Sequence, residues 1–437
     1  MTTIIISLVV LLVVLMMGVP VPFAFFASTI TIFLMGDYPS FLFLPRFGYA
    51  QISSIILIAI PLFVTSGKLM ERGGIGEALV DLVNCFVGRV KGGLGAVSVV
   101  ACAAFGAISG SGFATLSAIG SIMFPRMYAA GYPRGHCAAI VSSGALMSLL
   151  IPPSLNQILY AWVAGQSVLA CFMSTLVPGL MLVALFSIVN FWLLRKNETI
   201  ILDAPMPMPV RVKKTGKQFL WTLPALMMPF IILGGIYGGF MTPTEAAAVS
   251  IVWALPVGVF FYKGLNSLKV LVKCLLDAVT TAGVIMIMLF SVMIMCNLYI
   301  RENLPQMIMD NLLMISDNPA VLIIIVNLFM ILIGMIMDDT SAILMTTPIL
   351  LPVVMQLGIH PVHFAAILGV NIGMGCVMPP TAPFLFLGSR VGKVPVTEML
   401  PTSFWLLLFA WLPALILTTY IPGLALALPR AMGLVTI

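Results

Sequence analysis

Apolar stretches long enough to cross a lipid bilayer recur from one end of this sequence to the other. A helix needs roughly 20 apolar residues to span the hydrocarbon core, and the 437-residue chain is 61% hydrophobic with only 8% charged residues. A soluble domain carries far more charge on its surface. The stretches are continuous and lack the alternation with a period of two that a transmembrane β-barrel requires. The sequence therefore predicts an all-α protein that crosses a membrane many times.

The second half of the chain repeats the first at a fixed offset of 227 residues, the separation of Pro152-Pro153 from Pro379-Pro380. No gap is needed between positions 122 and 165, and the matches include residue types that rarely coincide by chance in an apolar chain. Besides the proline pairs, they are Pro125 with Pro352, Gly131 with Gly358, His136 with His363, and Gly165 with Gly392. We therefore predict two related halves, residues 1–215 and 216–437.

Each half is expected to contain about five membrane spans and one segment that enters the membrane without crossing it. Residues 93–124 and 320–350 are too long and too broken for a single crossing, and each favours a re-entrant hairpin. Residues 136–164 and 362–389 favour broken helices, because the Pro-Pro pair in each removes helical hydrogen bonds. An odd number of spans would invert the second half relative to the first, and inverted-topology repeats are typical of secondary transporters.

The largest basic cluster of the chain predicts its orientation in the membrane. Six Lys and Arg residues fall between Arg195 and Lys217, and the positive-inside rule places this loop in the cytoplasm. Counting spans outward from the loop places both termini on the periplasmic side. We therefore expect a multi-pass protein embedded in the lipid bilayer of the bacterial inner (cytoplasmic) membrane.

The helices of the first half are interrupted twice by small polar residues and prolines. Ser109-Gly110-Ser111-Gly112 allows a tight chain reversal, and Ile151-Pro152-Pro153-Ser154 ends a helix. Backbone outside helices is tolerated at membrane depth only where it faces protein, water or a ligand, and clustered oxygen ligands suit a hard cation such as Na⁺. The residues predicted to bind ion or substrate here are Ser109, Gly110, Ser111, Thr115, Ser148, Pro152 and Ser154.

The second half has matching interruptions, but one of them is acidic. Met337-Asp338-Asp339-Thr340-Ser341 corresponds to the Ser111 region, and Met378-Pro379-Pro380-Thr381 to the first Pro-Pro break. An acid at membrane depth is costly and indicates function, and alignment with Ser111 favours Asp338 over Asp339 as the inward-facing acid. The residues predicted to bind ion or substrate here are Asp338, Thr340, Ser341, Asn371, Gly373, Gly375, Met378, Pro379 and Thr381.

Two other interpretations of these breaks, helix packing and an enzyme active site, compete with a transport site. At any single break, Ser and Gly can serve only close helix packing and Pro only a kink, but four breaks in two matched pairs favour function. An enzyme would need an acid–base or metal constellation, which three histidines and seven scattered cysteines do not supply. We therefore expect a protein that is not an enzyme, with no transition metal, no cofactor other than Na⁺ as coupling ion, and no nucleic-acid partner.

At these residues the chain resembles the large membrane subunit, or DctM-like permease, of tripartite ATP-independent periplasmic (TRAP) transporters. The motifs that carry the resemblance span essentially the whole chain. They are Pro61-Leu62-Phe63 with Gly67, Ser109-Gly110-Ser111, Ile151-Pro152-Pro153-Ser154, Thr242-Pro243-Thr244-Glu245-Ala246, Met337-Asp338 followed by Pro348 and Pro352, and Gly358-Ile359-His360-Pro361 through Phe364.

The resemblance implies a Na⁺-coupled importer of the elevator type, whose hairpins and broken helices form a moving transport domain. It also implies two partners, a small four-helix membrane subunit and a periplasmic solute-binding protein that delivers the substrate. Ser109, Ser111 and Ser154 match positions in or beside the first ion and substrate site, and Asp338 with Thr340 matches the second.

One departure concerns the second Pro-Pro break. The family usually has Thr-Pro-Pro-x-Gly there, and this chain has Met378-Pro379-Pro380-Thr381-Ala382. A threonine hydroxyl is missing, which leaves the backbone rather than the side chain of Met378 as the expected ligand.

The leading hypothesis is Na⁺-driven uptake of a small organic anion, such as a carboxylate, because helix N-termini that meet at the bilayer midplane favour negative groups. The alternative is a stand-alone anion transporter coupled to Na⁺ or H⁺, which would work without a binding protein. A channel is a third possibility. No nucleotide-binding loop is visible, which argues against ATP-driven transport.

Overall fold

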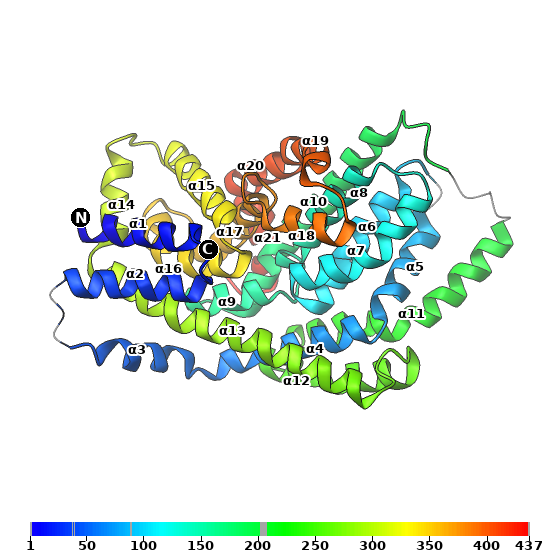
Figure 1. The fold of residues 1–437 in the computed structure, drawn as a ribbon, viewed down its shortest axis with the longest axis horizontal. Helices are drawn as coiled ribbons and strands as arrows, with labels where there is room; N and C mark the ends of the chain where they lie inside the picture. The colour runs from blue at the N-terminus through cyan, green and yellow to red at the C-terminus, as the bar shows by residue number, and fades with distance from the viewer. Residues whose placement is uncertain (1, 37, 39, 88–89, 202–207, 436–437) are drawn as a thin grey trace.

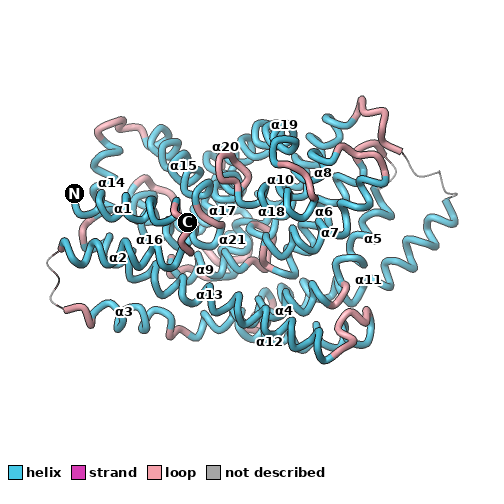
Figure 2. The backbone as a smooth tube through the Cα atoms, in the orientation of Figure 1, coloured by secondary structure: helices cyan, strands magenta, loops and turns pink. Residues whose placement is uncertain are grey.

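The computed structural model describes residues 2–36, 38, 40–87, 90–201 and 208–435, and all regular elements in these ranges are helices (Figures 1 and 2). The elements before the basic loop are α1 (Thr2–Met16), α2 (Val21–Met35), α3 (Phe43–Ile52), η1 (Ile55–Ile58), α4 (Ala59–Arg72), α5 (Ile75–Val87), α6 (Gly93–Ser109), α7 (Gly112–Ala129), α8 (Arg134–Ala145), η2 (Leu146–Leu149), α9 (Leu155–Val163) and α10 (Val168–Leu194). The elements after it are α11 (Met208–Tyr237), α12 (Pro243–Pro256), η3 (Val257–Phe261), α13 (Leu268–Arg301), α14 (Leu304–Leu313), α15 (Pro319–Ile336), α16 (Asp339–Gln356), α17 (Pro361–Cys376), α18 (Pro383–Gly392), α19 (Val396–Leu406), η4 (Leu407–Trp411), α20 (Leu412–Tyr420) and α21 (Pro422–Ala431). The prediction of an all-α multi-span protein is confirmed.

Fewer unbroken helices reach membrane length than the sequence led us to expect. Among the described residues, six helices are long and apolar enough to cross a membrane, or seven if α3 and the η1–α4 segment, which meet at 63°, count as one span. The sequence predicted about five spans in each half. The difference arises because Pro, Gly and Ser cut other apolar segments into helices of 10–17 residues, among them α1, α2, α6 and α17.

The boundaries of the helices recur at the repeat offset. Shifting α7 by 227 residues reproduces the bounds of α16, and α6 falls on α15 with a difference of one residue at its start. In the same way α8 begins where α17 begins, and α9 falls within a residue or two of α18. The backbone therefore carries the same internal periodicity as the sequence.

The predicted hairpins and broken helices correspond to pairs of helices. Residues 93–124 and 320–350 fall on the α6–α7 and α15–α16 pairs, which run a few residues further at their ends. Residues 136–164 fall on α8, η2 and α9, and residues 362–389 on α17 and α18; the Pro-Pro bond in each break is cis. The expected boundary between halves, at 215/216, lies inside α11, and residues 202–207 of the basic loop lie outside the described part of the chain.

The helices form two groups that meet along one interface. α13 runs along α2, α3 and α4, and α4 also packs on α12; we call these helices the long-helix layer (Figure 1, lower half). The α6–α7 and α15–α16 pairs and the broken helices lie together above them and form the hairpin layer. The two layers touch where α4 packs on α6 and α13 packs on α16. The turns of both helix pairs therefore lie near this interface.

Candidate functional site

The turn between α6 and α7 is built around one glycine. Gly110 has φ +63°, a left-handed conformation that side chains with a Cβ rarely adopt. Ser111 then caps α7, with its hydroxyl accepting a bond from the Ala114 amide at 3.5 Å. The Thr115 hydroxyl donates to the Ser111 carbonyl at 2.8 Å and lies 3.1 Å from the Ser109 hydroxyl. These bonds hold three hydroxyls and a carbonyl in one compact turn.

The turn between α15 and α16 is built around two carboxylates. Asp338 caps α16 and accepts a bond from the Ser341 amide at 3.2 Å, and the Ser341 hydroxyl also donates to it. Asp339 is only 3% exposed and accepts a 2.8 Å bond from the side-chain amide of Asn156. Thr340 donates to the oxygen of the same amide at 3.0 Å. Asn156, in the first turn of α9, therefore joins the two halves of the chain.

The choice of Asp338 as the inward-facing acid stays a prediction. Both acids line the cavity between the two layers, and Asp339 is the more deeply buried of the two. The alignment of Asp338 with Ser111 reflects a shared position as helix cap, and a cap turns its oxygen toward backbone amides of its own helix. The next residue, in the first turn of α16, is the one that faces α9.

The two turns line one cavity of about 530 Å³ between the long-helix layer and the hairpin layer. Of the predicted residues, those that line it are Ser109, Gly110, Ser111, Asp338 and Thr340. Asp339, Asn156 and Leu155 line it from the same side, and α4 and α13 supply the opposite wall. The cavity therefore collects residues from both halves and from both layers.

The other predicted residues lie outside this cavity. Thr115 and Ser341 support the two turns from within. Ser148 and Ser154 are buried beside the first turn, and Pro152 lines a separate apolar cavity of about 270 Å³ next to α11. Within α17, Gly375 packs against α15 and Gly373 against Trp411, while Asn371 bonds Asn327. Met378 is half-buried, and Pro379 and Thr381 are exposed.

Two of these buried residues retain an oxygen that has no hydrogen-bond partner among the described residues. One is the hydroxyl of Ser154, which is fully buried close to Gly110, and the other is the side-chain oxygen of Asn371. A buried polar atom without a partner is costly. Since oxygen atoms are the ligands that a hard cation prefers, the unpaired oxygens of Ser154 and Asn371 are chemically compatible with Na⁺.

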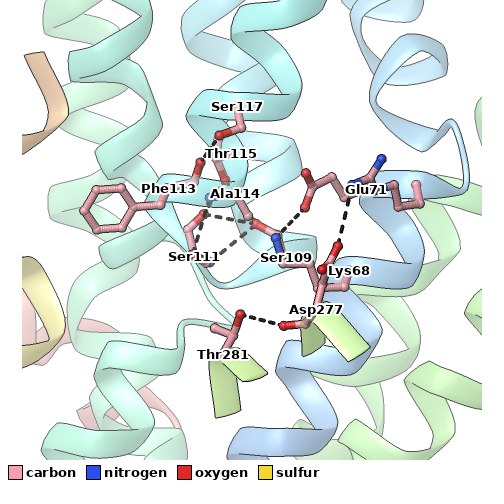
Figure 3. Close-up of polar contacts among 11 residues, drawn as sticks. Lys68, Glu71, Ser109, Ser111, Phe113, Ala114, Thr115, Ser117, Asp277 and Thr281 are labelled. Atoms are coloured by element: carbon pink, nitrogen blue, oxygen red, sulfur yellow. Dashed lines mark hydrogen bonds and ion pairs between the residues drawn. The ribbon is translucent and has the colours of Figure 1, made fainter. Parts of the chain in front are cut away.

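The long-helix layer contributes charged residues that sequence reasoning did not single out. Lys68 of α4 lines the cavity and pairs with Glu71 at 2.9 Å. One turn further on, Arg72 pairs with Asp277 of α13 at 3.6 Å, and the Thr281 hydroxyl donates to the Asp277 carbonyl (Figure 3). The group of charged residues at the end of an apolar helix, Lys68, Glu71 and Arg72, was a usable signal for Lys68. Asn156 gave no such signal, because only packing brings it to Asp339.

The approach of α4 to the first turn depends on Gly67. A Cβ at position 67 would lie 2.9 Å from the carbonyl oxygen of Ser109 and 3.1 Å from its Cα, too close for any other residue without a shift. The backbone of α4 therefore touches the turn directly, and Lys68 follows at the next position.

Membrane-length apolar helices that surround a cavity bounded by broken helices define the class of membrane transport proteins. A family model narrows this class: residues 8–424 match the DctM component of tripartite ATP-independent periplasmic transporters. The chain belongs to this family. Like its relatives, it is a multi-span transporter permease of the inner membrane and not an enzyme.

Several relatives align over most of their length. The chain is 35% identical to the C4-dicarboxylate TRAP transporter large permease protein DctM of Pseudomonas aeruginosa, over 86% of this chain and 87% of that protein. It is 31% identical to the sialic acid TRAP transporter large permease protein SiaM of Vibrio cholerae, over 86% and 87%. It is also 33% identical to the isethionate TRAP transporter permease protein DctMQ of Oleidesulfovibrio alaskensis, over 94% of this chain but only 64% of that longer protein.

A solved structure supports the fold. The YdaH transporter of Alcanivorax borkumensis superimposes with a TM-score of 0.58 at 14% sequence identity, over 87% of this chain and 88% of that one. At this level of identity, the likeness concerns the fold alone.

Proposed function

We propose that this protein is the large permease subunit of a Na⁺-coupled importer of small organic anions. The observation that supports this most directly is the cavity of about 530 Å³ that both helix turns line, with Lys68 on one wall and two carboxylates on another. Its volume lies in the range of pockets that enclose small organic ligands. A cation on one wall suits an acidic substrate, and oxygens on the other suit Na⁺.

The proposed substrate class follows from the compounds after which the relatives are named. They are named for C4-dicarboxylate, sialic acid, 2,3-diketo-L-gulonate and isethionate, all of which carry a negative charge at neutral pH. We therefore propose a small carboxylate or a related acid, without choosing among them.

The proposed Na⁺ ligands come from both halves. In the first half they are Ser109, Ser111 and Ser154, and in the second Asp338, Thr340 and Asn371. The unpaired oxygens of Ser154 and Asn371 support these assignments. The transmembrane Na⁺ gradient would drive uptake, and these residues would supply the oxygen ligands that replace the water shell of the ion.

The proposed partners are a small membrane subunit and a periplasmic solute-binding protein, in keeping with a tripartite family. We further propose that the two halves are inverted in the membrane, that both termini are periplasmic, and that the hairpin layer moves past the long-helix layer as an elevator. The close, side-chain-free contact between Gly67 and Ser109 suits a sliding interface.

Reconstitution into liposomes tests this function against a stand-alone transporter. Uptake of radiolabelled acids is measured with and without a Na⁺ gradient, and with the small subunit and the binding protein present or omitted. We expect uptake only with the gradient and both partners. Uptake that persists without a Na⁺ gradient, or full activity of this chain alone, would contradict the proposal.

A further inference from the structure

Lys68 is the one basic residue that lines the cavity among the described residues. It reaches the cavity because α4 touches the Ser109–Ser111 turn through Gly67, the preceding residue. Its side chain is 26% exposed and lines the same cavity as Ser109 and Ser111. A positively charged group is thus present in the cavity that the first turn lines.

The ammonium group of Lys68 is only partly engaged. Its partner among the described residues is Glu71, one turn along the same helix at 2.9 Å. An ammonium has three N–H donors, so two remain for water or a ligand. Glu71 is itself 19% exposed and does not line the cavity. The pair therefore presents its positive member to the cavity and holds its negative member behind.

We propose that Lys68 is the specificity-determining residue that binds the acidic group of the substrate, facing the Ser109–Ser111 turn, and that Glu71 is a built-in competitor for the same ammonium. The inference rests on the proposed function, since it assumes that the cavity receives an organic anion. Asp338 and Asp339 repel a substrate anion from the second turn. The acidic group is thereby directed to Lys68.

The pair has a simpler interpretation, in which Lys68 and Glu71 only stabilise α4 as an i,i+3 ion pair. The two interpretations differ in the sign of the effect at Glu71. If the pair is structural, loss of either partner harms the protein in the same way. If Glu71 competes with the substrate, its neutralisation strengthens the attraction of Lys68 for the anion.

The experiment is Na⁺-driven uptake by the complete reconstituted transporter, with a C4-dicarboxylate, sialic acid, 2,3-diketo-L-gulonate and isethionate as probes. For the acid that the wild type transports, we expect Lys68→Gln to raise KM about 10- to 100-fold, the loss typical of a charge-assisted hydrogen bond. Lys68→Arg keeps the charge and should recover most of the affinity. Glu71→Gln should lower KM about 2- to 5-fold, as expected when a partly screened like charge is removed.

Arg72→Gln is the matched control, because Arg72 lies on the same helix and pairs with Asp277 but does not line the cavity. It should leave KM unchanged, and the yield of detergent-extracted protein confirms that each variant folds. An unchanged KM in Lys68→Gln, or a parallel rise in Lys68→Gln and Glu71→Gln, overturns the inference while leaving Na⁺-driven uptake intact. If the wild type shows no Na⁺-dependent uptake of any probe, the proposed function fails, and this inference fails with it.

Discussion

The two turns that line the cavity occupy equivalent positions in the repeat. Each caps the helix that follows it, one with a hydroxyl and the other with a carboxylate. Ser111 and Asp338 each begin a helix and accept a bond from the amide three residues later, Ala114 in one case and Ser341 in the other. The first turn needs a left-handed glycine and carries only hydroxyls, whereas the second has no glycine and carries two acids. The two turns therefore share a capping position, while only the second carries charge.

A second pair of equivalent segments diverges in burial. The first Pro-Pro break, with Ser154, is buried throughout, whereas Pro379, Pro380 and Thr381 of the second break are exposed. The two breaks therefore share a cis Pro-Pro bond, but only the first is enclosed. The comparison indicates that the two predicted ion sites differ in both charge and accessibility.

The largest expected effect tests the difference in charge. Asp338→Asn keeps a good helix cap and removes the negative charge, and we expect Na⁺-dependent uptake to fall about 30- to 100-fold, as for the loss of a charged interaction of about 2–3 kcal/mol. Ser111→Ala, its counterpart, should lower uptake only about 5- to 10-fold, because a neutral hydroxyl contributes about 1 kcal/mol. Initial rates of uptake measured against Na⁺ concentration test this. An equal loss of Na⁺-dependent uptake in the two variants would mean that the charge of Asp338 gives the second turn no stronger interaction with the ion.

The next prediction concerns the bond between the halves. Asn156→Ala removes the amide that donates to buried Asp339 and should cost about 1–3 kcal/mol of unfolding free energy, because a buried acid is left without its donor. A double-mutant cycle with Asp339→Ala should give a coupling of at least about 1 kcal/mol. Gln157→Ala is the control, since its amide donates to the Leu149 carbonyl. Additive losses for Asn156 and Asp339 would show that the contact carries no energy.

The smallest effect concerns the glycine that only the first turn requires. Gly110→Ala should cost about 1–2 kcal/mol for its left-handed backbone, plus the cost of crowding, because its Cβ would lie 3.2–3.3 Å from Leu155 and Pro153. Gly165 has the same φ of +63° but open space around it, so Gly165→Ala isolates the backbone cost. Thermal unfolding in detergent compares the two. If Gly165→Ala loses as much stability as Gly110→Ala, packing against the first Pro-Pro break contributes nothing.

The helix breaks could be predicted because their causes are local. Proline removes a hydrogen bond, glycine permits a left-handed turn, and Ser or Asp caps the helix that follows. The repeat offset then related each break in the first half to one in the second, so both helix pairs were located from the sequence. Span counts were less accurate, because whether a short apolar helix crosses the membrane alone or with a neighbour depends on packing.

The composition of the site was only partly predictable. Alignment with Ser111 brought Asp338 into the predicted site, and Asp338 lines the cavity as a helix cap, while Asp339 is the more buried acid. Asn156 and Lys68 reach the cavity through contacts between segments far apart in the chain. No local pattern encodes such contacts, although charged residues at the end of an apolar helix, as at Lys68, are a sign to look for them.

The helix caps have a consequence for how an ion would be held. The oxygens of Ser111 and Asp338 already satisfy backbone amides of α7 and α16. A cation bound at either oxygen would share it with an amide of the first helical turn, since hydroxyl and carboxylate oxygens have further lone pairs, so that ion affinity and fraying of the helix end are thermodynamically linked. Hydrogen exchange at the amides of Ala114 and Ser341 would then report ion occupancy directly, in each half separately and without any transport assay.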